Sequence, residues 1–133
     1  MPIEITVDPN SGVPVFRQII EQVRLHVAGG MLVAGEELPS TRQLSQELGV
    51  NPMTVSKAFS LLEAEGLVDR RPGLPLIVRD LGVDAAAAER RELLARALDP
   101  AVTTARQLGI STTQAVSLFR DMLNDAASGE AEG

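Results

Sequence analysis

The chain has 133 residues, a formal net charge of −6, no cysteine and one histidine, His26. This composition excludes disulfides and thiolate metal sites, and one histidine is too few for a zinc site or a histidine-based catalytic triad. We therefore expect no metal, no other cofactor and no enzymatic activity. The acidic balance argues at first against a nucleic-acid partner, but residues 38–79 carry five basic and four acidic side chains, so a local basic surface is still possible.

The chain also lacks signals for membrane insertion or export. No apolar run approaches the roughly 20 residues that span a bilayer. The first ten residues lack the basic and apolar regions of a signal peptide. We therefore predict a cytoplasmic protein without a membrane partner.

The first third of the chain predicts an extended segment and two helices. Residues 3–7 alternate apolar and polar side chains, like a short strand or an extended arm. Helical spacing of apolar residues begins after Pro14 and ends at Gly29–Gly30. Ser40 and Gln43 form a capping box that opens a second helix, and Gly49 is a suitable stop for it.

The next helix depends on how Pro52 is interpreted. A proline inside a helix costs about 3 kcal/mol, but at the first helical position its missing N–H is no loss. Asn51 is a preferred N-cap, so we predict a helix that begins at Pro52 and runs to about Glu65. Its buried stripe follows the spacing i, i+3, i+4, i+7 and consists of Val55, Ala58, Phe59 and Leu62.

Residues 67–70 and 76–79 are short strand candidates, with a turn over 71–75. A short helix, a three-residue turn with glycine, a second helix and a hairpin together describe a winged helix-turn-helix. The fold class is therefore mainly α: a winged helix-turn-helix domain over residues 1–80, followed by a short helical region over 81–133. Such a domain binds DNA through its second helix or serves as a protein-interaction module.

The C-terminal region predicts three helices and a tail. Asp84 could cap a helix through Leu98, and Asp99–Pro100 repeats the cap-then-proline pattern and predicts a separate helix to Leu108. Ser111 and Gln114 form another capping box, and residues 128–133 are expected to be disordered. The apolar stripes here could cover the winged-helix core, but they are better explained as a homodimer surface. The predicted interface residues are Leu93, Leu94, Leu98, Val116, Phe119, Met122 and Leu123.

Beyond these patterns, the stretch PSTRQLSQELGVNPMTVSKAFSLLEAEGLV, residues 39–68, resembles the DNA-binding domain of the GntR family of bacterial transcription regulators. The Asn-Pro-x-Thr-Val segment and the short helical tail resemble the YtrA-like subgroup in particular. The resemblance implies a dimeric transcription regulator that binds double-stranded DNA. The chain has no room for the larger effector domain of other branches, so the identity of any small-molecule effector is unknown.

The resemblance and the residue chemistry together give a candidate DNA surface. By resemblance, Arg42 and Thr54 contact the DNA backbone or bases and Gly73 lies at the wing tip. By chemistry, Lys57 suits a phosphate and Met53 a thymine methyl group. The full predicted set is Ser40, Arg42, Asn51, Met53, Thr54, Ser56, Lys57, Arg70, Arg71 and Gly73.

Two departures from the family pattern affect this surface. Pro52 and Ser56 stand where many relatives carry arginine, so base reading must differ from that of better-known relatives. The wing also lacks the second glycine that is usual in the family, so minor-groove insertion is not carried over to this chain. We predict a dimeric repressor of an inverted-repeat operator. The alternative is a winged-helix protein-interaction module, which a large apolar patch on the outward face of helix 52–65 would favour.

Overall fold

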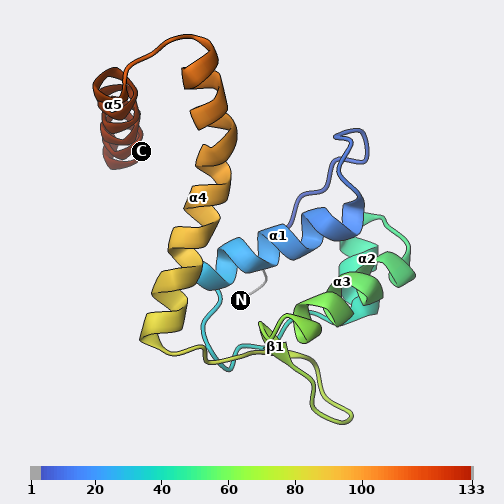
Figure 1. The fold of residues 1–133 in the computed structure, drawn as a ribbon. Coiled ribbons are helices and arrows are strands. Elements are labelled where there is room, and N and C mark those ends of the chain that lie inside the picture. Colours follow the sequence, from blue (N-terminus) through green and yellow to red (C-terminus); the bar gives the residue numbers. More distant parts are fainter. Residues whose placement is uncertain (1–3, 133) are drawn as a thin grey trace. The chain divides into compact units, whose positions relative to one another are not determined.

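The computed structural model describes residues 4–132 (Figure 1). The chain divides after Arg91 into two compact units. Within residues 4–132 the fold is mainly helical, with five helices and a two-stranded sheet. None of the helices in this part of the chain is long and apolar enough to cross a membrane.

Three helices form the body of the first unit: α1 (Val15–Ala28), α2 (Thr41–Leu48) and α3 (Pro52–Ala64). The Ser40 hydroxyl accepts the N–H of Gln43 at 3.0 Å, which caps α2. The Asn51 side chain accepts the N–H of Met53 at 2.8 Å, so Pro52 is the first residue of α3. Both predicted helix starts are confirmed, because the caps act within a few residues of the chain.

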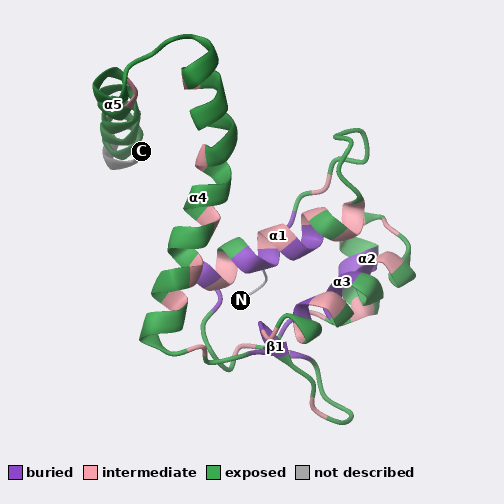
Figure 2. Ribbon diagram, viewed as in Figure 1, coloured by how far each residue is buried: buried purple, intermediate pink, exposed green. Residues whose placement is uncertain are grey.

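The core lies where α1 and α2 pack on α3 (Figure 2). All four residues of the predicted α3 stripe are buried, and they meet Ile19, Ile20 and Val23 of α1 and Leu44 of α2. Every residue of this buried cluster comes from positions 5–78. The winged-helix domain therefore has a core of its own.

The wing is a short hairpin in which β1 (Val68–Asp69) pairs antiparallel with β2 (Ile77–Val78). Both strands are two residues long, shorter than predicted. Glu37 forms an isolated bridge to Ile77, so the segment before α2 lies along the outer edge of the hairpin.

The N-terminal segment is an extended arm and not a sheet strand. The backbone N–H of Thr6 donates to Gln22 Oε1 at 2.8 Å, and Gln22 Nε2 donates back to the Thr6 carbonyl. Gln18 makes the same two-way contact with the backbone of Asp8 at 2.8 Å in each direction. Two glutamine side chains of α1 therefore take the place of a partner strand.

The first unit continues past the predicted boundary at residue 80 and includes the start of α4 (Val83–Gln107). Arg24 of α1 is buried and forms ion pairs with Glu65, which caps the end of α3, and with Glu89 of α4 at 3.3 Å. Leu81 packs against the core. These contacts attach the first turns of α4 to the winged helix.

The predicted helix break at Asp99–Pro100 is wrong, because α4 is continuous and Pro100 lies inside it. Proline lacks an N–H to donate to the preceding turn. That turn is exposed, so water can hydrate the carbonyl group that loses its donor. An aspartate before a proline is therefore compatible with either a helix start or a tolerated helix interior.

The last helix, α5 (Thr112–Glu132), begins as predicted. The Ser111 hydroxyl accepts the N–H of Gln114 at 3.2 Å, and Gln114 Oε1 accepts the N–H of Ser111 at 3.2 Å, which is a complete capping box. Residues 128–132, predicted to be disordered, continue α5 instead; Gly133 lies outside the described residues.

Candidate nucleic-acid interface

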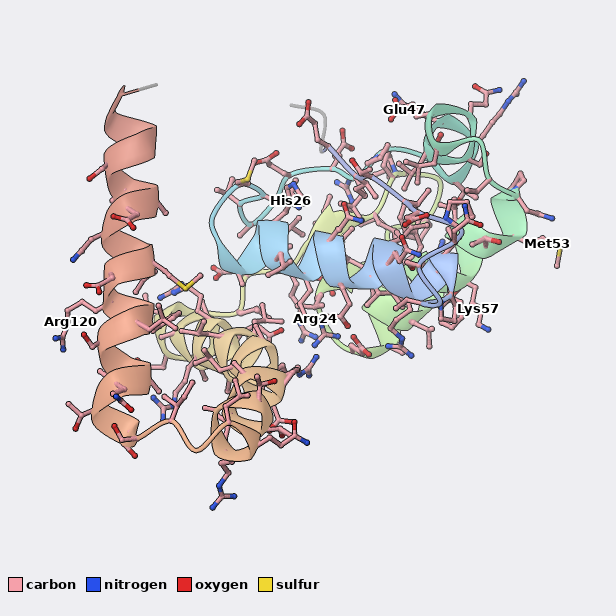
Figure 3. The ribbon with its side chains drawn as sticks, turned by 90° about the horizontal axis from the view of Figure 1, so that it is seen from above. Arg24, His26, Glu47, Met53, Lys57 and Arg120 are labelled. Atoms are coloured by element: carbon pink, nitrogen blue, oxygen red, sulfur yellow. The ribbon has the colours of Figure 1, made fainter. Side chains whose placement is uncertain are left out.

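The N-terminal half of α3 presents small or uncharged side chains and one cation to the surface. Met53 is 78% exposed, and Ser56 and Lys57 are also exposed, whereas Thr54 is half-buried. Met53 and Lys57 project from α3 at the end of the unit where α1 begins (Figure 3). The face carries no large apolar patch, so it matches the surface that favours DNA over a protein partner.

The start of α2 adds two predicted residues. The Ser40 hydroxyl oxygen accepts the N–H of Gln43, so its hydrogen can still be donated to a ligand. Arg42 lies in the first turn of α2, is exposed, and makes no ion pair with any residue in the range 4–132. It is therefore available to a phosphate.

The two wing arginines have carboxylate partners. Arg70 Nε lies 3.1 Å from Glu63 Oε2, at the end of α3. Arg71 donates to Glu37 Oε2 at 3.0 Å and to the carbonyl oxygen of Pro75 at 3.2 Å. Arg71 therefore stabilises the wing turn. To bind a phosphate, each of the two arginines must release its carboxylate partner or contact the carboxylate and the phosphate at once.

An open groove of about 490 Å³ lies between the start of α2, α3 and the wing. It brings together Ser40, Ser56, Arg70, Arg71 and Gly73 of the predicted set. The other five predicted residues, Arg42, Asn51, Met53, Thr54 and Lys57, lie on α2 or on α3 and its cap, outside this groove. Gly73 has φ +70 and open space around it, so a left-handed turn, and not a close contact within the chain, requires glycine there.

Two residues of α1 that the sequence did not indicate lie beside this surface. Lys57 Nζ lies 3.9 Å from the centroid of the Phe16 ring, and Arg17 Cζ lies 5.5 Å from the same centroid. Phe16 fits the helical spacing of apolar residues that begins after Pro14, and nothing in the sequence links it to a lysine 41 positions later.

The predicted dimer residues are not buried within one chain. Leu93 and Leu98 are half-buried, and five residues of the set are exposed: Leu94, Val116, Phe119, Met122 and Leu123. Among described side chains, α4 and α5 contain no buried residue. Throughout the described residues, no group of three or more acidic, histidine or cysteine side chains is placed to hold a metal ion.

Residues 16–78 match the family of bacterial regulatory proteins, gntR family. The chain is 31% identical over 121 residues to the HTH-type transcriptional regulator Rv1152 of Mycobacterium tuberculosis, covering 91% of this chain and 95% of the relative. This chain belongs to the GntR family. It is also 26% identical over 126 residues to the HTH-type transcriptional repressor YtrA of Bacillus subtilis, covering 95% and 97% of the two chains.

Some GntR relatives are much longer than this chain. The probable rhizopine catabolism regulatory protein MocR of Rhizobium meliloti is 34% identical over 100 residues, which are 75% of this chain but 20% of that protein. The near full-length likeness to the B. subtilis repressor therefore makes this chain a YtrA-like GntR regulator, as the sequence predicts.

Solved structures agree with the winged-helix fold. A GntR family regulator from Listeria monocytogenes superposes with a TM-score of 0.76 at 20% identity, covering 84% of this chain and 97% of the other. YtrA from Sulfolobus acidocaldarius gives 0.56 at 35% identity, covering 71% and 96%. The DNA-binding domain of AraR, solved in complex with operator ORX1, gives 0.51 at 22% identity, covering 59% and 98%.

The GntR assignment fixes the general activity. The protein is a DNA-binding transcriptional regulator of the GntR family, and it is not an enzyme. The predicted DNA-binding transcriptional regulator and the predicted lack of enzymatic activity are both confirmed.

Proposed function

We propose that this GntR regulator is a homodimeric repressor that places α3 in the major groove of an inverted-repeat operator. The observation that supports this most is the outward face of α3, where exposed Met53 and Ser56 flank Lys57 without a large apolar patch. Small polar side chains let a helix approach base edges closely, and Met53 offers an apolar contact for a thymine methyl group. Thr54 and Asn51, in the first turn of α3 and at its cap, lie next to them.

The proposed phosphate contacts surround this helix. Arg42 and Lys57 have no carboxylate partner among the described residues, so they can bind phosphates without first breaking an ion pair. Ser40 can donate its hydroxyl hydrogen from the start of α2. Arg70 and Arg71 are paired with Glu63 and Glu37. Each guanidinium group would have to leave its carboxylate, or bind the carboxylate and a phosphate together, so we assign these arginines a smaller contribution.

The proposed dimer uses the second unit. Isolated helices are marginally stable in water, and most helical stability in proteins comes from burying an apolar face. The exposed apolar residues of α4 and α5 have no such cover within one chain. A second copy supplies an identical apolar face, and a two-fold axis lets each face cover the other.

The operator follows from this dimer. Two recognition helices related by a two-fold axis read two half-sites about one helical turn apart, roughly 34 Å. Repression is proposed because the B. subtilis relative YtrA, similar over almost its whole length, is named a repressor.

Selection of bound duplexes from random-sequence DNA by the full-length protein tests the proposal. We expect enrichment of an inverted repeat, bound with a stoichiometry of two chains per duplex. If Arg42 and Lys57 of both subunits each neutralise a phosphate, log K should fall with log salt with a slope of roughly −4. Enrichment of a single half-site, or a slope near zero, would contradict the proposed interface, and failure to enrich any sequence would favour the protein-interaction alternative.

A further inference from the structure

Two cations are gathered on one aromatic ring at the junction of α1 and α3. Lys57 Nζ lies 3.9 Å from the Phe16 ring centroid and Arg17 Cζ lies 5.5 Å from it. Both distances are within the range of about 6 Å for a cation–π contact. Phe16 is half-buried and packs against the core, so its ring is a fixed support for the two cationic side chains.

The helices bring these residues to the DNA-facing end of the first unit. Phe16 and Arg17 are in the first turn of α1, and Lys57 is in the second turn of α3. α1 packs along α3, and Lys57 projects from the same end of α3 as Met53 (Figure 3). Arg17 is exposed, whereas its neighbour Phe16 turns toward the core.

These two cations differ from four arginines of the first unit because they lack a carboxylate partner. Arg24, Arg70, Arg71 and Arg79 each have an acidic partner within 4.0 Å. Neither Arg17 nor Lys57 forms an ion pair with any residue between positions 4 and 132. Like charges held on one ring repel each other, and an anion bound between them would relieve that repulsion.

We propose that Arg17 and Lys57, supported by Phe16, form a phosphate-binding site that extends the DNA contact from α3 to α1. The ligand is the DNA backbone beside the major groove, where Arg17 and Lys57 each neutralise one of two neighbouring phosphates, so Arg17 adds one phosphate per subunit to those proposed for Arg42 and Lys57. The inference depends on the proposed placement of α3 in that groove, because α1 reaches the backbone only when α3 is docked. Phe16 is a positioning residue: it holds Lys57 over its ring and does not itself touch the DNA.

The salt dependence of binding distinguishes a phosphate contact from a structural effect. With full-length protein and a random-sequence 30-base-pair duplex, Arg17→Gln should reduce the steepness of log K against log salt by about 1.8 per dimer, one phosphate per subunit. Over a fourfold rise in salt, the wild type should lose about tenfold more affinity than the variant. Arg17→Lys should restore most of the slope, and Arg106→Gln, at an exposed arginine of α4, is the matched control and should leave it unchanged.

A double-mutant cycle tests the role of Phe16. Phe16→Leu keeps an apolar side chain on the core and removes the ring, so it should weaken binding severalfold in the wild type and much less in the Lys57→Ala background. Thermal unfolding of each variant identifies any loss that comes from misfolding. If Phe16→Leu weakens binding equally in the wild type and in the Lys57→Ala background, Phe16 does not position Lys57.

Arg42→Gln separates the two proposals. If Arg17→Gln leaves the slope unchanged while Arg42→Gln and Lys57→Ala reduce it, only the α1 site is wrong. If none of the three substitutions changes the slope, the proposed docking of α3 is wrong as well.

Discussion

At the scale of single residues, the surface of α3 separates contacts that position the protein from contacts that read sequence. Phosphate contacts carry no sequence information, whereas base contacts do. Lys57→Ala should therefore weaken binding to the selected operator and to random DNA by a similar factor. Met53→Ala or Thr54→Ala should instead relax the preference at particular base pairs, by about 1–3 kcal/mol each.

Competition binding on operator variants checks this difference. Each variant duplex carries one changed base pair, and its affinity is compared between the wild type and the substituted protein. If Met53→Ala and Lys57→Ala lower the affinity for every duplex equally, Met53 does not read a base.

The residue scale also shows where sequence reasoning reaches its limit. The caps made by Ser40, Asn51 and Ser111 could be predicted, because each joins residues two or three positions apart. The partners of the wing arginines could not, since Arg71 meets a glutamate 34 positions earlier in the chain. The contact between Phe16 and Lys57, which are 41 positions apart, could not be predicted for the same reason. Long-range pairs depend on how elements pack, which residue spacing does not specify.

At the scale of helices and strands, two prolines preceded by a capping residue behave differently. Asn51–Pro52 starts α3, while Asp99–Pro100 lies inside α4. The first follows Gly49, whose left-handed conformation ends α2, so the chain must begin a new helix. No glycine interrupts α4 before Pro100, and the preceding residues are good helix formers. The local pattern was the same, and the preceding residues decided the outcome.

Pro100→Ala tests whether α4 is continuous. In a helix interior the change should stabilise the helix by up to about 3 kcal/mol. Amide hydrogen exchange around residues 96–104 should then slow in the variant. If a new helix began at Pro100, the substitution would leave exchange nearly unchanged, and Asp99→Ala would instead cost about 1 kcal/mol as a lost cap.

At the scale of the whole molecule, the division after Arg91 separates a unit with its own core from one without buried side chains among those described. The winged helix was predictable because its core stripes are periodic and its caps are local. The compact unit extends to Arg91 because the ion pair between Arg24 and Glu89 joins the start of α4 to α1, and these residues are 65 positions apart in the sequence. Most residues of the predicted dimer stripes are exposed in the described part of one chain, so the dimer remains a prediction.

The proposed dimer predicts the behaviour of two altered proteins. A chain ending at Arg91 keeps every core residue and the Arg24–Glu89 pair, so it should fold but remain monomeric. It should lose most of its operator affinity, because one half-site supplies only part of the contacts. In the full-length protein, Phe119→Asp should have the same effect by placing an unpaired charge in the interface. Arg106→Gln, at an exposed polar position of α4, is the control and should remain dimeric. Sedimentation measures all three, and if either the truncated chain or Phe119→Asp is still a dimer, the subunits associate through another surface.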